Sequence, residues 1–179
     1  MANRIQVLPG TLGRIASVVC KSPEYFYLKE AHAVVTDGQP YPTLEGRFEI
    51  SQPGHYHPIP GLTHAPDSIA AAGQAAYTLF AQASLSGLLT AFIPQMELEE
   101  IADIFRSGNG KWAYLKRIEE TDFKHLPTSF VGAVRVTKIS PAPEGYIFDL
   151  QTKFMPGSYP EGLSGLSSHR HSFRFSAKF

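Results

Sequence analysis

A histidine- and proline-rich segment, residues 55–64, which we expect to be a loop, carries the side chains best suited to chemistry. The segment reads His55-Tyr56-His57-Pro58-Ile59-Pro60-Gly61-Leu62-Thr63-His64. An imidazole titrates near neutral pH, so a histidine here can accept a proton or activate a water molecule. A tyrosine phenol can orient a carbonyl or an amine through a hydrogen bond. These residue types predict that proton-transfer chemistry takes place at this segment.

The stretch that follows predicts a long buried helix, which must position the segment. Between Ser68 and Ser86 seven residues are Ala, one is Gly and none is charged, so a sheet can approach the helix closely without desolvating a charge. Pro66 suits the first turn, and the Asp67 carboxylate complements the helix dipole. The unpaired N–H groups near Asp67 and Ser68 can polarise a carbonyl oxygen.

Strand patterns lie on both sides of this helix. Residues 28–35 and 44–50 have strand character, and Asp37-Gly38 between them is a strong turn signal. After the helix, period-two alternation marks three further strands. They cover residues 130–139, 146–155 and 169–179.

Three intermediate segments are less regular. Residues 85–93 fit either a strand or a continuation of the helix, and residues 112–119 fit a strand and a helix equally well. Residues 96–106 have the pattern of a short amphipathic helix. A long small-residue helix wrapped by strands is the central element of a hot-dog fold. We therefore expect one α+β domain over residues 1–179, with a curved antiparallel sheet around the helix.

Composition and charge exclude several classes of protein. The 16 basic and 16 acidic residues cancel, which argues against a nucleic-acid partner. No apolar run reaches the roughly 20 residues of a membrane span, so we expect no membrane partner and a cytoplasmic location. Cys20 stands alone and fits a packing residue better than a nucleophile. His169 and His171 have no third ligand nearby in sequence, so we expect neither a metal nor another cofactor.

Other enzyme signatures are missing from the sequence. No G-x-S-x-G elbow, P-loop or dinucleotide fingerprint occurs. A hot-dog dehydratase needs a histidine and a helix carboxylate about one turn before a glutamine. The position four residues before Gln74 is Ala70, and Asp67 lies a further turn back, so dehydration is disfavoured.

One family matches several of these residues. The run Gly46-Arg47-Phe48-Glu49-Ile50, followed by Tyr56, His64, Gln74 and Tyr77, resembles the FcoT-like hot-dog thioesterases. That family has a tyrosine eight residues before a polar residue at the helix start, and Gln-x-x-Tyr inside the helix. Tyr56 and His64 keep the first spacing, and Gln74 and Tyr77 keep the second. The chain departs from the pattern at His64 itself, where the family has an amide, and at Gly73, where it has asparagine.

The resemblance implies a reaction on an acyl thioester. Some family members are similar to enzymes of isonitrile lipopeptide and β-amino-acid macrolactam biosynthesis, which add glycine to an α,β-unsaturated acyl thioester. We expect conjugate addition of glycine to a 2-enoyl chain on acyl carrier protein or coenzyme A, followed by hydrolysis to an N-carboxymethyl-3-amino acid. Simple acyl-thioester hydrolysis is the alternative, and a dehydratase or a non-catalytic acyl-binding module is a weaker one. The resemblance also implies a homodimer, because hot-dog sites lie at dimer interfaces.

Roles for individual residues follow from this interpretation. His64 is the candidate base and Tyr56 orients the carbonyl or the amine, beside the helix start at Asp67 and Ser68. A glycine carboxylate needs a cation, and the later strands offer three. These are Arg135, Arg170 and Arg174.

Gln74, Tyr77 and Tyr25 complete the candidate substrate-binding residues. Each candidate also has a purely structural interpretation. His64 can cap the helix, and the tyrosines can be core residues with satisfied hydroxyls. His55 and His57 can be surface residues of a loop.

Overall fold

The computed structural model describes most of the chain. It covers residues 1–20, 22–51, 57–59, 62–65, 67–101, 112–117, 128–143, 145–156 and 169–177. The backbone alone is described for 57–59, 62–65, 67–69, 112–117, 156 and 169–177. The elements in chain order are β1 Ala2–Gln6, α1 Pro9–Val19, the 3-10 turn η1 Pro23–Tyr25, β2 Leu28–Thr36, β3 Thr43–Glu49, β4 His57–Ile59, β5 Leu62–Ala65, α2 Asp67–Ser86, β6 Trp112–Arg117, β7 Ser129–Ala142, β8 Gly145–Pro156 and β9 His169–Ala177.

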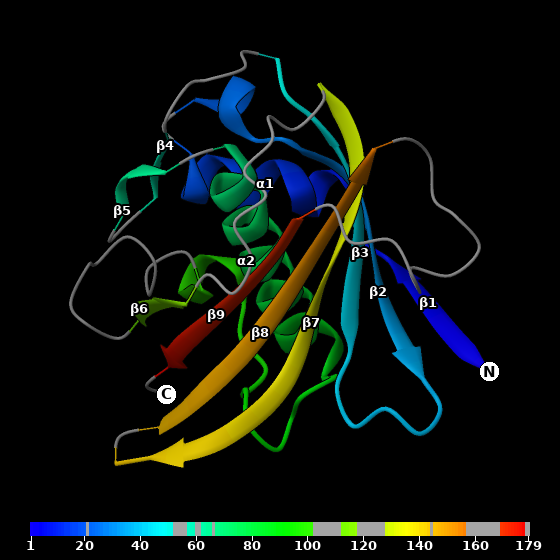
Figure 1. Cartoon of the computed structure of the whole chain (residues 1–179). Helices are drawn as coiled ribbons and strands as arrows, with labels where there is room; N and C mark the ends of the chain where they lie inside the picture. The colour runs from blue at the N-terminus through cyan, green and yellow to red at the C-terminus, as the bar shows by residue number, and fades with distance from the viewer. Residues whose placement is uncertain are drawn as a thin grey trace.

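Most of these strands form one large sheet that curves around α2 (Figure 1). The sheet has seven strands in the order β1-β2-β3-β7-β8-β9-β6, and β4 and β5 form a separate pair. Every pairing is antiparallel. The first strand after α2, β6, therefore lies at the edge of the sheet, and the last strand, β9, lies between β6 and β8. The predicted α+β architecture with a curved antiparallel sheet is confirmed.

Helix α2 fills the hollow of the sheet, as its composition predicts. Every residue from Ala70 to Ser84 is buried, because small side chains let other elements approach from all sides. Gly87 ends the helix with a positive φ of 66°. The N–H of Leu88 then donates to the Ala83 carbonyl, and the N–H of Gly87 to the Ser84 carbonyl, which is a Schellman cap.

The face of the sheet toward α2 is apolar and aromatic. Phe48 stacks on Phe130 with ring centroids 4.9 Å apart, and Phe154 meets both rings edge to face. Gly132 permits this cluster, because a Cβ there would lie 2.2 Å from the Phe154 ring. Gly46 is its cross-strand partner and lies under the Leu28 side chain. Two facing glycines thus let bulky neighbours lie flat on the strands.

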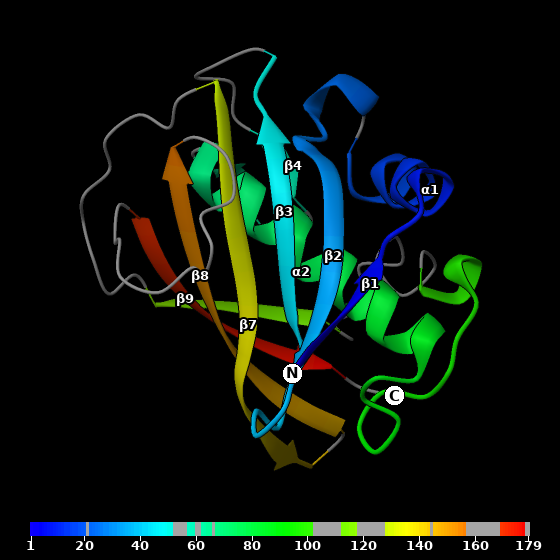
Figure 2. The same cartoon turned by 90° about the vertical axis from the view of Figure 1, so that its right-hand side faces the viewer.

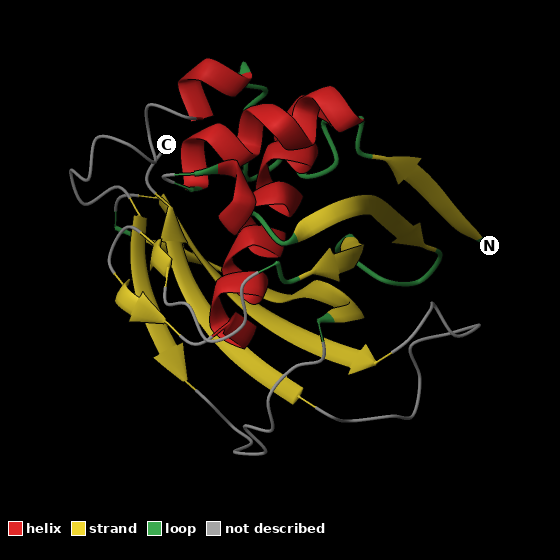
Figure 3. Cartoon of the chain, turned by 90° about the horizontal axis from the view of Figure 1, so that it is seen from above, coloured by secondary structure: helices red, strands yellow, loops and turns green. Residues whose placement is uncertain are grey.

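The helices lie together on the inner side of the sheet (Figures 2 and 3). Helix α1 packs on α2 and was not predicted from the sequence. Its buried residues recur with helical spacing, which is a detectable signal. They are Leu12, Ile15, Ala16 and Val19. Strand β1 was also unpredicted, since all its residues except Ile5 are exposed and no alternation marks it.

Several sequence expectations are corrected. The histidine- and proline-rich segment was expected to be a loop, but it contains the β4–β5 pair. Within the predicted segment 85–93, residues 85 and 86 are the last two of α2 and residues 87–92 form turns rather than a strand, because Gly87 ends the helix. Residues 112–117 are a strand, and a helical turn begins at Leu98 inside the predicted 96–106 helix. The Asp37-Gly38 turn between β2 and β3 is confirmed, with Gly38 at φ 77°.

None of the described helices combines the length and the apolarity that crossing a lipid bilayer requires.

Candidate functional site

The start of α2 is assembled from segments far apart in the sequence. Strand β5 ends at Ala65, two residues before α2 begins, and both β4 and β5 contact α2. Strand β9 contacts α2 as well, and His171 pairs with Thr152, a buried residue of β8. Figure 1 and Figure 2 show the start of β9 at the same end of the molecule as the start of α2. The backbone therefore brings histidine positions from β4, β5 and β9 to one end of the helix.

The predicted catalytic side chains at this end lie outside the described residues. Tyr56 is outside them entirely, as is His55. For His64 in β5, and for Asp67 and Ser68 in α2, the structure gives the backbone alone. It places His64 three positions before the first residue of α2, as the sequence suggests.

Gln74 lies about two helical turns into α2, and its side-chain amide is fully occupied by structural bonds. Its Oε1 accepts from the N–H of Tyr27 at 2.7 Å, and its Nε2 donates to the carbonyl of Tyr25 at 2.7 Å. The same Nε2 lies 3.7 Å from Cys20 Sγ. The side chain is 1% exposed. Gln74 thus fastens the α1–β2 connection onto α2, and Tyr25 enters the candidate site through its backbone carbonyl.

Tyr77 is the next polar residue on the same helix and points into different surroundings. It is 3% exposed, and burial raises the pKa of its phenol far above the ordinary value of 10.0, so it remains protonated at neutral pH. Tyr77 lines a cavity of about 220 Å³ between α1, α2 and the helical turn at 98–101. Gln74 and Tyr77 are neighbours on α2 but differ in their surroundings. The Gln74 amide binds backbone groups of Tyr25 and Tyr27, whereas the Tyr77 side chain borders a cavity.

Cys20 lies at the end of α1 beside Gln74. Burial raises the pKa of its thiol to about 11, and the nearby Lys29 ammonium opposes this rise only in part. The thiol is therefore neutral at physiological pH and a poor nucleophile. This agrees with the prediction that Cys20 is a packing residue.

Arg135, one of the predicted carboxylate-binding cations, lies on the opposite face of the sheet. Arg135 is exposed on β7 and donates to Gln151 Oε1 of β8 at 3.1 Å. Arg135 pairs across the strands with Thr43 of β3. The next residue of β3, Leu44, is buried and faces α2, so Thr43 and Arg135 lie on the other face of the sheet. Arg170 pairs in register with Lys153 and Arg174 with Asp149, and the alternate positions of β8 are buried toward α2. Within one copy of the chain, the structure does not bring Arg135 together with Gln74 and Tyr77.

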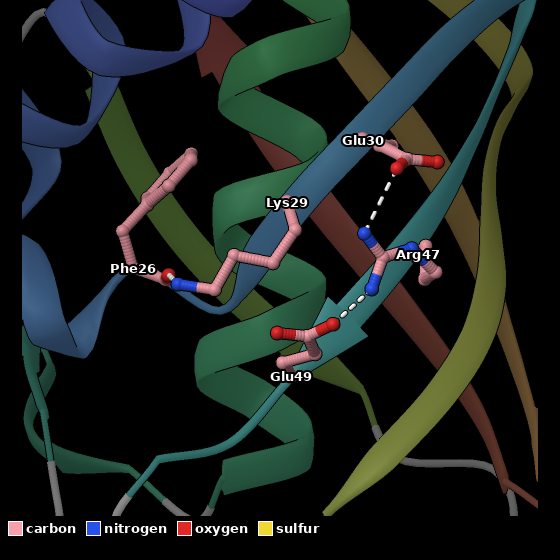
Figure 4. Close-up of polar contacts among 5 residues, drawn as sticks. All are labelled: Phe26, Lys29, Glu30, Arg47 and Glu49. Carbon is pink, nitrogen blue, oxygen red and sulfur yellow. Dashed lines mark hydrogen bonds and ion pairs between the residues drawn. The ribbon is translucent and has the colours of Figure 1, made fainter.

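That outer face carries a network of ion pairs (Figure 4). Arg47 of β3 donates to Glu30 of β2 at 2.8 Å and pairs with Glu49 of its own strand. The hydrogen bond from Arg47 holds the pKa of Glu30 below its ordinary value, and the two carboxylates raise the pKa of Arg47. Lys29 donates to the carbonyl of Phe26 at 2.8 Å and so braces the turn before β2. The charges of Arg47, Glu30 and Glu49 are thus matched by one another.

No cluster of metal ligands occurs in the described part of the chain. There, no three side chains among His, Cys, Asp and Glu lie close enough together to hold an ion. The cavity beside Tyr77 was missed by the sequence interpretation, because its walls come from α1, α2 and residues 98–101. Only the helical spacing in α1 could have hinted at it.

No protein-family model matches the chain, and no curated protein matches it either.

Proposed function

We propose that the chain is a hot-dog enzyme that adds glycine to the β-carbon of a 2-enoyl thioester and then hydrolyses the thioester. The observation that carries the proposal is the buried helix α2 inside a curved antiparallel sheet, with a histidine-bearing strand ending two residues before the helix starts. A hot-dog fold has this central helix and this wrapping sheet. The Gln-x-x-Tyr pattern at Gln74 and Tyr77 on α2 adds to the likeness.

The start of α2 can serve as the electrophilic part of the site. Its first N–H groups have no partner within the helix, so they can donate to a thioester carbonyl. The glycine amine attacks Cβ, the C=C electron pair moves toward the carbonyl oxygen, and these donors stabilise the resulting enolate. His64 accepts the proton lost by the amine and returns a proton to Cα. Tyr56 orients the carbonyl or the amine.

Hydrolysis completes the sequence in the same place. A water molecule, deprotonated by His64, attacks the thioester carbon, and the carrier thiol leaves as the carboxylic acid forms. The carbonyl oxygen again carries the developing charge, so one set of donors serves both steps. The carrier is acyl carrier protein or coenzyme A.

Gln74 and Tyr77 support this site in different ways. The Gln74 amide is bonded to the backbone of Tyr25 and Tyr27, so it positions the segment next to α2. The buried phenol of Tyr77 stays neutral and borders space for an apolar group. A glycine carboxylate beside α2 would need a cation other than the chain's own Arg135, or Arg135 from a second copy. We expect a homodimer, and light scattering at micromolar concentration tests it.

Mass spectrometry of products tests the reaction. Purified protein is incubated with short and medium 2-enoyl thioesters, each with and without glycine. We expect an acid heavier by one glycine, formed only with glycine and lost in His64→Ala. His32→Ala, on the outer face opposite Glu45, is the matched control and should keep activity.

Other outcomes would redirect the proposal. Free enoic acid formed equally with and without glycine would replace addition by simple thioester hydrolysis. Full activity in a folded His64→Ala variant would remove His64 as the base. Absence of any product, with the thioester still bound, would favour an acyl-binding module.

A further inference from the structure

We infer that the cavity between α1, α2 and residues 98–101 is a binding site for an uncharged hydrocarbon group of about six to ten carbons. The cavity measures about 220 Å³. It borders α2 at Tyr77 and Ala81, about 15–21 Å along the helix from Asp67, so it lies apart from the helix start. The inference does not depend on the proposed reaction.

Six of the ten residues that line the cavity are aliphatic. Each of the three segments around it contributes aliphatic side chains, and all but one of these residues are buried. They are Ile15, Val18 and Val19 of α1, Ala81 of α2, and Leu98 and Ile101 of the helical turn. Such a surface gains free energy by covering a hydrocarbon and offers little to a polar ligand.

The polar groups at the cavity are already matched. Arg14 of α1 and Glu99 of the helical turn are both exposed and form an ion pair with each other. The Ser17 hydroxyl donates to the Arg14 carbonyl at 2.7 Å. Tyr77 is a neutral phenol because burial raises its pKa. A charged ligand would have to lose water without gaining an unpaired counter-ion here, so an uncharged one is favoured.

The volume sets the size of the occupant. An engineered apolar cavity of ~150 Å³ stays dry and takes up benzene. The cavity in this chain is larger, at about 220 Å³, and protein interiors otherwise leave few voids that exceed a water molecule. The single methyl group of Ala81, a buried residue of its wall, leaves space that a larger side chain would fill.

The test uses 1-octanol as the probe and the full chain. Methyl chemical shifts of Ala81, Val18 and Val19 are followed during titration, together with the melting temperature. We expect saturable shifts at these methyl groups and a rise in melting temperature. Octanoate at neutral pH should bind at least tenfold more weakly than octanol.

Three variants locate the site. Val18→Phe and Ala81→Leu fill the cavity from opposite walls, and each should weaken octanol binding at least tenfold. Leu85→Phe adds an aromatic ring at an exposed position of α2 outside the cavity and should leave binding unchanged. If one of the two cavity-filling variants misfolds, the other variant and the methyl shifts of the unmodified chain still test whether octanol binds in the cavity.

Either of two results would overturn the inference. One is the absence of saturable methyl shifts in the unmodified chain up to the solubility limit of octanol. The other is binding that persists unchanged in a folded Val18→Phe or Ala81→Leu variant.

Discussion

The two faces of the large sheet carry hydrogen bonds of similar length in opposite settings. On the inner side, Gln74 bonds the backbone of Tyr25 and Tyr27 at 2.7 Å with 1% of its surface exposed. On the outer side, Arg47 bonds Glu30 at 2.8 Å where water reaches both groups. Loss of the inner bonds would leave buried backbone groups without partners, whereas water replaces the outer ones. Length therefore says little about what a polar contact contributes, and burial decides.

The sharpest test of this contrast is Gln74→Leu. We expect the free energy of unfolding to fall by about 3 kcal/mol, because the buried N–H of Tyr27 and the partly buried carbonyl of Tyr25 lose the Gln74 amide at once. Urea denaturation measures it. Gln39→Leu, at an exposed turn position, is the matched control and should change stability by less than about 0.5 kcal/mol. A loss below about 1 kcal/mol for Gln74→Leu would contradict the structural role given to its amide.

Gly132→Ala probes the apolar part of the inner face. The new methyl group would lie 2.2 Å from the Phe154 ring and 3.0 Å from the Lys153 carbonyl oxygen. Since Phe154 is held between other rings, we expect a loss of about 1–3 kcal/mol in the same assay. Gly13→Ala, in helix α1 with open space around it, should instead stabilise by about 0.5–1 kcal/mol. Equal effects at both glycines would show that the close approach at Gly132 is unimportant.

Cys20, on the inner side of the sheet, should make the free energy of unfolding depend on pH. The folded-state pKa of about 11 lies above the ordinary value of 9.0, so the unfolded chain releases the thiol proton first. Stability should therefore be complete below pH 9 and decline as pH rises toward 11, by about 1–2 kcal/mol after discounting for partial exposure. Unfolding in urea at several pH values, under reducing conditions, measures the slope.

Cys20→Ala should flatten this slope between pH 9 and 11. Tyr77 contributes a similar loss at higher pH, because burial also raises its pKa, so Tyr77→Phe serves to separate the two. An unchanged slope in Cys20→Ala would mean that another group governs alkaline unfolding.

Arg47→Met on the outer face should have the smallest effect. We expect a change of less than about 1 kcal/mol, reduced further by salt, because the charges of Glu30 and Glu49 return to water. Denaturation at low and high salt tests it. A loss of stability as large as that of Gln74→Leu would contradict the expected difference between polar contacts on the two faces of the sheet.

Local patterns in the sequence account for much of the fold. The alanine-rich composition predicts α2, strand character on both sides of a turn signal predicts β2 and β3, and period-two alternation predicts β7, β8 and β9. Helix α1 was missed although Leu12, Ile15 and Val19 have helical spacing. The pairing of β6 with β9 could not be predicted, because strand partners far apart in sequence leave no local signal.

The candidate site is predictable to a smaller extent. The sequence interpretation singled out Gln74 and Tyr77, and both lie buried on α2. Their partners could not be foreseen, since the bonds of Gln74 reach backbone groups 47 and 49 residues away. The roles of His64 and Tyr56 stay predictions. Residue type alone did not predict which cation can reach the site. Arg135 has a suitable charge, but it lies on the outer face of the sheet and cannot reach α2 in the same copy.

The edge position of β6 has a consequence for synthesis on the ribosome. Among the described residues, β6 pairs only with β9, and Arg117 meets Ser172. At roughly 5–20 residues per second, β6 emerges several seconds before its partner exists. During that interval its backbone donors and acceptors are open to strands of other nascent chains. Closure of the sheet is therefore among the last events of folding, and slow translation between β6 and β9 would prolong the period of greatest risk of aggregation.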